Sequence, residues 1–142
     1  SQFQISNFEF QIHLPRPMIN EKSLDFSFSG LKTAVLNKKT ENPQGLAWEL
    51  QEAITDVLVK KTLMAAEKFK VKNILLAGGV AANKRLREKM KIQISNFKFQ
   101  IEFYVPDIKL CTDNAAPIAS AAFFNYEPVS WRRIEAVPDL DL

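Results

Sequence analysis

The chain has 142 residues, of which 46% are apolar and 25% charged, so it can bury a core of its own and one domain is the default expectation. A net charge of +3 permits a nucleic-acid partner without requiring one. Cys111 is the only cysteine, which excludes an intrachain disulfide and favours a cytoplasmic protein. No apolar run approaches membrane-spanning length and no leader pattern opens the chain, so we expect no membrane partner. Because the chain begins at Ser1 and not at methionine, we expect a piece of a longer protein.

A nine-residue element occurs twice, at residues 4–12 (QISNFEFQI) and 93–101 (QISNFKFQI), and the copies differ only at Glu9 and Lys98. The flanking sequences are unrelated, which favours insertion of one element at two places over a solenoid repeat. Apolar and polar residues alternate in both copies, and this period of two predicts strands. We expect both copies to form edge or protruding strands away from any functional site.

His13 is the only histidine and precedes an extended, proline-rich stretch at residues 14–17. Metal sites built on imidazole usually use two or more histidines, so we expect His13 to be a surface or packing residue.

Residues 24–28 (LDFSF) alternate in the manner of a strand, and Gly30 is expected to turn the chain into a helix from Leu31. The hydroxyls of Ser27 and Ser29 converge on this turn. They either cap the helix or bind a nucleotide or phosphate.

Residues 37–42 are polar throughout and predict a solvated loop. Asn42 followed by Pro43 is typical of a helix start, with asparagine as the cap and proline in the first position. A helical apolar stripe then continues to about Phe69, which predicts a long core helix.

Residues 73–83 (NILLAGGVAAN) join an apolar run of strand length to a glycine turn and a following helix. Gly78 and Gly79 leave the main chain open to a ligand, and Asn83 places an amide near the helix start. The alternative is a tight turn that binds nothing. The helix itself carries a basic cluster, which either meets RNA phosphates or forms a solvated face: Lys84, Arg85, Arg87, Lys89 and Lys91.

Residues 103–106 predict another strand end, and residues 110–124 predict a loop followed by a helix. Thr112, Asp113 or Asn114 can cap this helix, and Pro117 is tolerated because it falls in the first turn. Asp113 either caps the helix or binds a metal. In the polar tail, the side chains of Trp131 and Ile134 are expected to anchor the chain to the body.

Three stretches in one order carry a family resemblance: residues 25–33 (DFSFSGLKT), 77–83 (AGGVAAN) and 110–116 (LCTDNAA), with residues 15–18 (PRPM) upstream. As a set they closely resemble the tRNA N6-adenosine threonylcarbamoyltransferase family, bacterial TsaD, formerly called an O-sialoglycoprotein endopeptidase. The resemblance runs from Pro15 to the tail, without the two nine-residue copies.

The resemblance implies an α/β fold, the actin-like ATPase (ribonuclease H-like) lobe with a mixed sheet flanked by helices. Residues 1–142 would be a single partial domain, the C-terminal half of a two-lobed enzyme. The family transfers a threonylcarbamoyl group from threonylcarbamoyl-AMP to N6 of the adenosine beside the anticodon, in tRNAs reading codons that begin with A. The implied partners are tRNA, the subunits TsaB and TsaE, and the missing N-terminal half.

By the same resemblance, Asn83, Gly78 and Gly79 match substrate-binding positions, and Asp113 matches a ligand of a divalent metal, iron or zinc. The histidine pair that completes the family's metal site has no counterpart here, and His13 does not match it.

The sequence departs from the family pattern beside Asp113. Ala115 stands where many members carry glycine, and Pro117, where methionine is usual, removes one N–H group from the helix start.

Two rival functions remain at this point. One is another actin-like phosphotransferase, such as a sugar kinase, that shares the glycine turn. The other is a non-catalytic fragment that serves as an interaction module. As a transferase, the isolated chain is expected to be inactive, because catalytic competence would need the missing N-terminal half.

Overall fold

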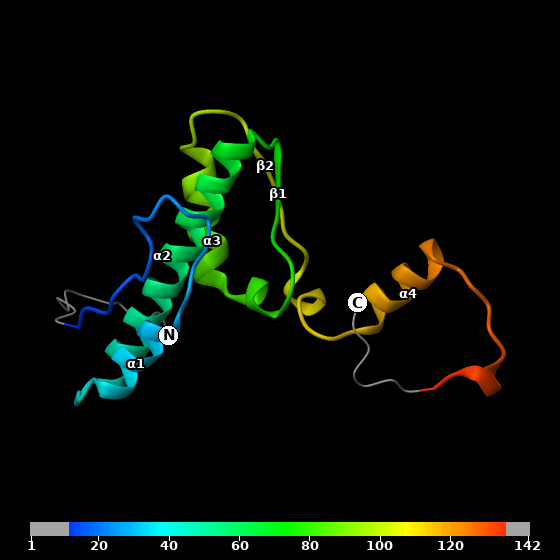
Figure 1. Cartoon of the computed structure of the whole chain (residues 1–142), viewed down its shortest axis with the longest axis horizontal. Helices are drawn as coiled ribbons and strands as arrows, with labels where there is room; N and C mark the ends of the chain where they lie inside the picture. Colours follow the sequence, from blue (N-terminus) through cyan, green and yellow to red (C-terminus); the bar gives the residue numbers. More distant parts are fainter. Residues whose placement is uncertain (1–11, 136–142) are drawn as a thin grey trace, which may run out of the picture.

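The computed structural model describes residues 12–135 of the chain. Helices α1, α2 and α3 and strands β1 and β2 form one body, while α4 lies to one side of it (Figure 1). Short 3₁₀ helices are written η, and the elements run in this order: α1 (Ser29–Asn37), α2 (Pro43–Phe69), β1 (Asn73–Leu75), η1 (Gly79–Ala82), α3 (Lys84–Ser95), β2 (Glu102–Tyr104), η2 (Ile108–Leu110), α4 (Ala115–Phe124) and η3 (Trp131–Arg133).

Helix α2 begins and ends where the sequence predicts. The side chain of Asn42 accepts a hydrogen bond from the Gly45 N–H at 2.8 Å, and Pro43 occupies the first turn. A Cβ on Gly45 would lie 2.5 Å from the Asn42 side chain, so a larger residue there would displace the cap. At the other end Lys70 adopts a left-handed conformation with φ of 51° and donates its N–H to the last turn.

Strands β1 and β2 pair in parallel, with Ile74 opposite Phe103, and α3 forms the crossover between them. The sequence-based strand predictions at both positions are therefore confirmed. The α/β class is confirmed too, but the expected mixed sheet is not, because the two strands found in residues 12–135 are parallel. A two-stranded sheet leaves the actin-like architecture as an expectation.

Two apolar clusters hold the body together. The larger lies between α2, α3 and the sheet and is centred on Leu86, Met90 and Ile74. The smaller joins Leu14 and Leu31 to the N-terminal half of α2. Because α2 contributes to both clusters, this helix is the central element of the body (Figure 1).

The second nine-residue copy is not a strand, so that prediction is wrong. Residues 93–95 form the last turn of α3, and residues 96–101 lead into β2. Ile94 and Ile101 are buried in the larger cluster, with Phe97 and Phe99 packed against it. Since α3 is already hydrogen-bonded up to this point, adding residues to a helix costs less than starting a strand without a partner. In the first copy, residues 4–11 lie outside the described range.

Residues 24–28 were also predicted to be a strand, and this prediction is wrong as well. They form no ladder with β1, β2 or any other described residue, and the ring of Phe26 is half exposed. Alternation creates a strand only where a neighbouring strand supplies hydrogen-bond partners. Helix α1 begins at Ser29, two residues before the predicted start.

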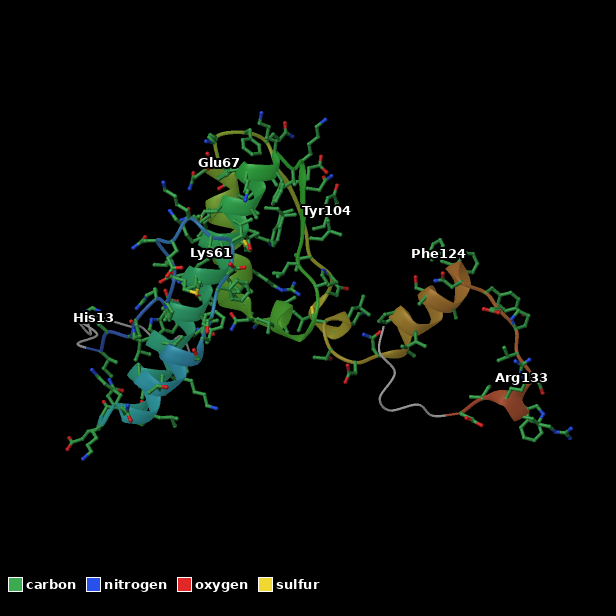
Figure 2. All side chains as sticks on the ribbon, viewed as in Figure 1. His13, Lys61, Glu67, Tyr104, Phe124 and Arg133 are labelled. Carbon is green, nitrogen blue, oxygen red and sulfur yellow. The ribbon has the colours of Figure 1, made fainter. Side chains whose placement is uncertain are left out.

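A C-terminal arm, residues 112–135, follows the buried Cys111 and contains no buried residue. Trp131 and Ile134 are 75% and 68% exposed, so the predicted anchoring of the tail to the body is wrong for this part of the chain. Figure 2 shows the same arrangement, with the arm residues Phe124 and Arg133 far from Lys61 on α2. None of the helices within residues 12–135 has both the length and the apolar character needed to cross a membrane.

Candidate functional site

The turn between β1 and η1 forms the first part of the candidate site. Gly78 has φ of 83°, a conformation that favours glycine. A Cβ on Gly78 or Gly79 would meet no atom within 4 Å, so the turn has an open face. The Gly78 carbonyl accepts from the Ala81 N–H at 2.9 Å, whereas the N–H groups of Gly78 and Gly79 meet no acceptor among the described residues. The turn therefore offers two free hydrogen-bond donors.

Asn83 ends this turn, and both the oxygen and the nitrogen of its amide are hydrogen-bonded. Its Oδ1 accepts from the Leu86 N–H at 2.9 Å, which makes Asn83 the N-cap of α3. Its Nδ2 donates to Oε1 of Gln51 on α2 at 3.0 Å. Asn83 and Val80 also line a cavity of about 200 Å³ against α2. The amide is thus fixed beside an open space.

Arg87 joins the turn to the chain segment that carries Asp113. Its guanidinium donates from Nε to the Ala81 carbonyl at 2.5 Å and from Nη2 to the Pro106 carbonyl at 2.8 Å. Nη2 also lies 3.0 Å from Sγ of the buried Cys111. Arg87 therefore connects η1 to the segment from Pro106 to Cys111.

Asp113 lies two residues after Cys111, so their Cα atoms are at most about 7 Å apart. The cap of α4 is Asn114, whose Oδ1 accepts from the Ala116 N–H at 2.9 Å. Pro117 occupies the first turn of α4, as predicted. The Asp113 carboxylate is exposed and makes no hydrogen bond or ion pair within residues 12–135. It is available to a ligand, but nothing in the arm fixes it.

The described residues do not make a complete metal site. No group of three or more His, Cys, Asp or Glu side chains in residues 12–135 is arranged to hold a metal ion. His13 is exposed and lies at the opposite end of the view from the arm (Figure 2). A retained catalytic metal has about three protein ligands, and Asp113 alone does not meet that need.

The two serines predicted to meet on the α1 turn do lie together. The hydroxyls of Ser27 and Ser29 are 3.1 Å apart, and the Ser29 N–H donates to Ser27 Oγ at 3.4 Å. The N-cap position itself is Phe28, which provides no side-chain cap. Both hydroxyls are exposed.

The centre of the basic cluster of α3 is paired with carboxylates of α2, so Arg85 and Lys89 form neither a solvated face nor a phosphate-binding face. Arg85 donates two hydrogen bonds to Glu52 at 2.6 and 3.0 Å, and its guanidinium lies 5.6 Å from the centre of the Trp48 ring. Lys89 bonds to Glu52 at 2.9 Å and also to Asp56. With Arg87 bound to carbonyl groups, only the outer lysines of the cluster remain exposed.

This ion-pair network shifts the pKa values of its members. Hydrogen bonds from Arg85 lower the pKa of Glu52 to about 2, with Lys89 adding to the effect and burial opposing it. Burial alone would raise the pKa of Glu49, but hydrogen bonds from Arg16 and the Leu14 N–H outweigh it, and the pKa is lowered. The network therefore joins α2 both to α3 and to the segment that carries Arg16.

Gln51 and Arg87 are the site residues that sequence reasoning missed. Arg87 was read only as part of a basic cluster, and Gln51 was not considered. One signal was present: Glu49, Glu52 and Asp56 stand three and four positions apart, which places three carboxylates on one face of α2. That acidic stripe predicts that a basic neighbouring helix will be neutralised.

Comparisons with known proteins give the family context of this geometry. The family model for tRNA N6-adenosine threonylcarbamoyltransferase, TsaD, matches residues 2–120. Relatives with that name include proteins from Bacillus cereus ATCC 14579, 48% identical over 124 residues, and Francisella tularensis subsp. holarctica, 48% identical over 120 residues. A Bacillus licheniformis relative is 46% identical over 127 residues.

These matches cover most of this chain but a smaller share of each relative. They span 82%, 80% and 84% of the chain in the same order, and 36%, 35% and 37% of the relatives. The chain therefore spans about a third of the length of the curated relatives it matches. On the family match and on these identities, the chain belongs to the tRNA N6-adenosine threonylcarbamoyltransferase family.

Proposed function

We propose that this chain supplies the glycine turn and Asp113 to an enzyme that transfers a threonylcarbamoyl group from threonylcarbamoyl-AMP to N6 of the adenosine beside the anticodon of tRNA. The observation that carries the proposal is the open turn at Gly78 and Gly79, with its two free N–H donors, in a chain of this family. The remaining parts of the site would come from the portion of the enzyme that this chain does not span.

The turn suits the nucleotide end of the acyl-adenylate. In the reaction, N6 of adenosine forms a bond to the carbamoyl carbon, the bond from that carbon to the phosphate oxygen breaks, and AMP leaves with the bonding electrons. Preorganised N–H groups stabilise such developing negative charge. We assign this role to the N–H groups of Gly78 and Gly79, which donate to no acceptor among the described residues and are therefore available to a ligand.

Asn83 is proposed as a substrate-positioning residue beside this turn. Its amide oxygen is used by the helix cap, and its amide nitrogen donates one hydrogen bond to Gln51. The second N–H of Nδ2 remains to donate to a ligand in the adjoining cavity of about 200 Å³. Because both atoms of the amide are already anchored, the direction of that second N–H is fixed.

Asp113 is proposed as one oxygen ligand of a divalent metal, iron or zinc. A carboxylate oxygen is a suitable ligand for either ion. The other ligands must come from outside the described residues, because these contain no group of donors near Asp113. The metal would supply a positive charge for a substrate oxygen when bound.

A chimeric enzyme tests the proposal directly. The matched 124-residue segment of the Bacillus cereus relative is replaced by this chain, and the purified chimera is incubated with tRNA and threonylcarbamoyl-AMP. TsaB and TsaE, the proposed protein partners, are added in a parallel reaction. We expect threonylcarbamoyladenosine in the digested tRNA, detected by nucleoside mass spectrometry, and none with the isolated chain.

Two substitutions in the chimera report on the assigned residues. Asn83→Ala should weaken acyl-adenylate binding by roughly 1–3 kcal/mol, the scale for a lost polar contact in a buried site. Asp113→Ala should abolish metal uptake measured after dialysis. A folded chimera that makes no product would instead support the non-catalytic interaction module. The sugar-kinase alternative is disfavoured by the family match.

A further inference from the structure

The end of the body opposite the glycine turn carries a concentration of positive charge. It combines the end of α2, the start of β1, the last turns of α3 and the second nine-residue copy (Figure 1). We name this surface the basic tip and define it by five exposed lysines: Lys68, Lys70, Lys72, Lys91 and Lys98.

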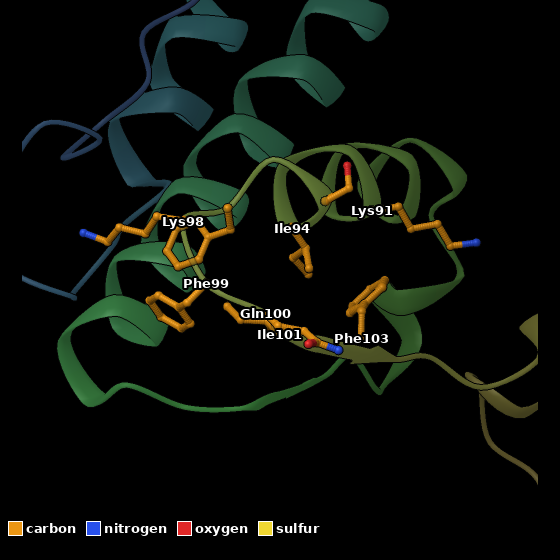
Figure 3. Close-up of a pocket in the computed structure, with 9 residues that line it drawn as sticks. Lys91, Ile94, Lys98, Phe99, Gln100, Ile101 and Phe103 are labelled. Carbon is orange, nitrogen blue, oxygen red and sulfur yellow. The ribbon is translucent and has the colours of Figure 1, made fainter.

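Two neighbouring cavities make the basic tip a continuous surface. One, of about 590 Å³, is lined by Lys91 and Lys98 (Figure 3). The other, of about 520 Å³, is lined by Lys70, Lys72 and Lys98. Both are also lined by Phe99 and Gln100, so Lys91 of α3 and the lysines beside β1 border cavities that share one aromatic side chain.

Most of this charge is available to a ligand. Within the described residues, Lys70, Lys72 and Lys91 make no ion pair and no side-chain hydrogen bond, whereas Lys98 pairs with Glu67. The other nearby carboxylate, Glu102, accepts a hydrogen bond from the Tyr104 hydroxyl. The basic tip thus differs from the centre of α3, whose cations are bound to α2.

Aromatic rings accompany the lysines. Phe97 and Phe99 are half-buried and lie edge to face with their ring centres 4.9 Å apart. Figure 3 shows Phe99 and Phe103 on the wall of the larger cavity, with Ile94 and Ile101 beside them. Lysines that meet phosphates, combined with rings on which bases stack, form the usual binding surface for single-stranded nucleic acid.

We propose that the basic tip binds a single-stranded segment of RNA. The inference rests on the proposed function, because the RNA in question is the tRNA that this enzyme would modify. Lys72 and Gly78 are six residues apart, so the tip lies at most about 20 Å from the glycine turn along the sheet. About six stacked nucleotides cover that distance. Because the tip and the glycine turn lie at opposite ends of the body, the tip provides a contact separate from the reacting adenosine (Figure 1). The second nine-residue copy supplies its aromatic part.

The first test is a salt titration of RNA binding to the whole 142-residue chain. A fluorescent 12-nucleotide single-stranded RNA is titrated with the chain, and the dissociation constant is measured by anisotropy at several salt concentrations. The double variant Lys72→Gln/Lys91→Gln should weaken binding about tenfold and reduce the salt slope by about 1.4, because each lost phosphate contact contributes roughly 0.7 for single strands. Both lysines are exposed and unpaired, so the fold is retained.

The matched control is Lys38→Gln/Lys39→Gln, which removes the same charge from the exposed loop between α1 and α2. It should change neither the dissociation constant nor the slope. Equal weakening by both double variants would show attraction by net charge alone and would overturn the proposal. Equal or tighter binding to vesicles of anionic phospholipid would overturn it as well.

A second variant tests stacking separately from charge. Phe99→Leu keeps the apolar packing and removes the flat ring, so binding should weaken about fivefold or more at an unchanged salt slope. Circular dichroism at each salt concentration verifies that the variant is folded, and Phe97→Leu provides a second reading if it is not. Unaltered affinity in a folded variant excludes the stacking role.

The outcome is separable from that of the proposed function. RNA binding is measured without threonylcarbamoyl-AMP, so it can succeed even if the chimera is inactive. In an active chimera, Lys72→Gln/Lys91→Gln should raise KM for tRNA and leave kcat unchanged. An unchanged KM would overturn the basic tip as an RNA contact while leaving the transferase activity in place.

Discussion

The body and the C-terminal arm each carry one part of the candidate site, and they hold it in different ways. In the body, the Asn83 amide bonds to the Leu86 N–H and to Gln51. In the arm, Asp113 is exposed and bound to nothing within residues 12–135, and the α4 side chains beyond it are exposed too. The described residues of this chain hold the turn in place, whereas none of them holds the Asp113 carboxylate.

Helix α4 itself supports this conclusion. Its sequence AAPIASAAFF is apolar on every side, which is typical of a helix buried on all faces. Yet Ile118, Phe123 and Phe124 are each more than 70% exposed. The chain spans about a third of its relatives' length, so we expect the part of the relatives that it does not span to cover the equivalent helix there.

The largest expected effect comes from the core of the body, for which the arm has no counterpart. Leu86→Ala removes a side chain that is 1% exposed in the main cluster and should lower the free energy of unfolding by about 2–5 kcal/mol. Phe124→Ala in the arm, at 79% exposed, should change it by less than about 0.5 kcal/mol. Urea unfolding of both variants measures this. Similar losses would show that the arm packs on the body in solution.

A pH titration tests the ion pairs that stiffen the body. Because the pKa of Glu52 is lowered to about 2 from its ordinary 4.5, its contribution is fully present above pH 4.5 and is lost as the pH falls towards 2. The loss should be at most about 3 kcal/mol, because solvent screens the partly exposed ion pairs. Glu52→Gln should flatten this acid limb in urea unfolding, and Glu127→Gln in the arm should leave it intact. If Glu52→Gln and Glu127→Gln changed the acid limb equally, the ion pairs of Glu52 would not be its cause.

The two asparagine caps provide a smaller, directly matched comparison. Asn83→Ala should cost about 1–2 kcal/mol of global stability, because α3 packs on α2 and its start is part of the cooperative unit. Asn114→Ala removes a similar cap from α4 and should leave global unfolding unchanged, with only a small loss of helix signal. Thermal unfolding followed by circular dichroism distinguishes the two. A loss of global stability in Asn114→Ala would show that α4 unfolds together with the body.

The smallest effect is expected at Asp113. In the isolated chain, Asp113→Ala should change stability by less than about 0.5 kcal/mol, because the carboxylate has no described partner. Metal analysis after dialysis should find no tightly bound iron or zinc in either form. One ion held per chain and lost in Asp113→Ala would mean that the arm already contains a complete site.

Local signals predicted much of the fold. The start of α2 could be predicted from Asn42 and Pro43, and β1 and β2 from short apolar runs, because neighbours along the chain determine these features. Residues 24–28 and 93–101 were misread for one reason. Whether an alternating segment becomes a strand depends on a partner strand and on the element before it, and neither can be read from the segment itself.

The candidate site was predicted in outline only. The glycine turn and the position of Asn83 followed from residue types, but the contact to Gln51 joins residues 32 positions apart and requires the packing of α2 on α3. The pairing of Arg85 and Lys89 with Glu52 also requires the packing of α2 on α3. Side-chain charge can be read from sequence, whereas pairing depends on which helix faces which.

The left-handed residue at the end of α2 has a consequence for protein engineering. Lys70 has φ of 51°, where a side chain costs roughly 1 kcal/mol that glycine avoids. Lys70→Gly is therefore a simple route to a more stable chain for crystallisation or binding assays. The same replacement removes one ammonium group from the basic tip, so the more robust variant would be the weaker RNA binder. At this position stability favours glycine, whereas RNA binding favours lysine. Selection for thermal stability alone would therefore weaken RNA binding, and the selection itself would not detect this loss.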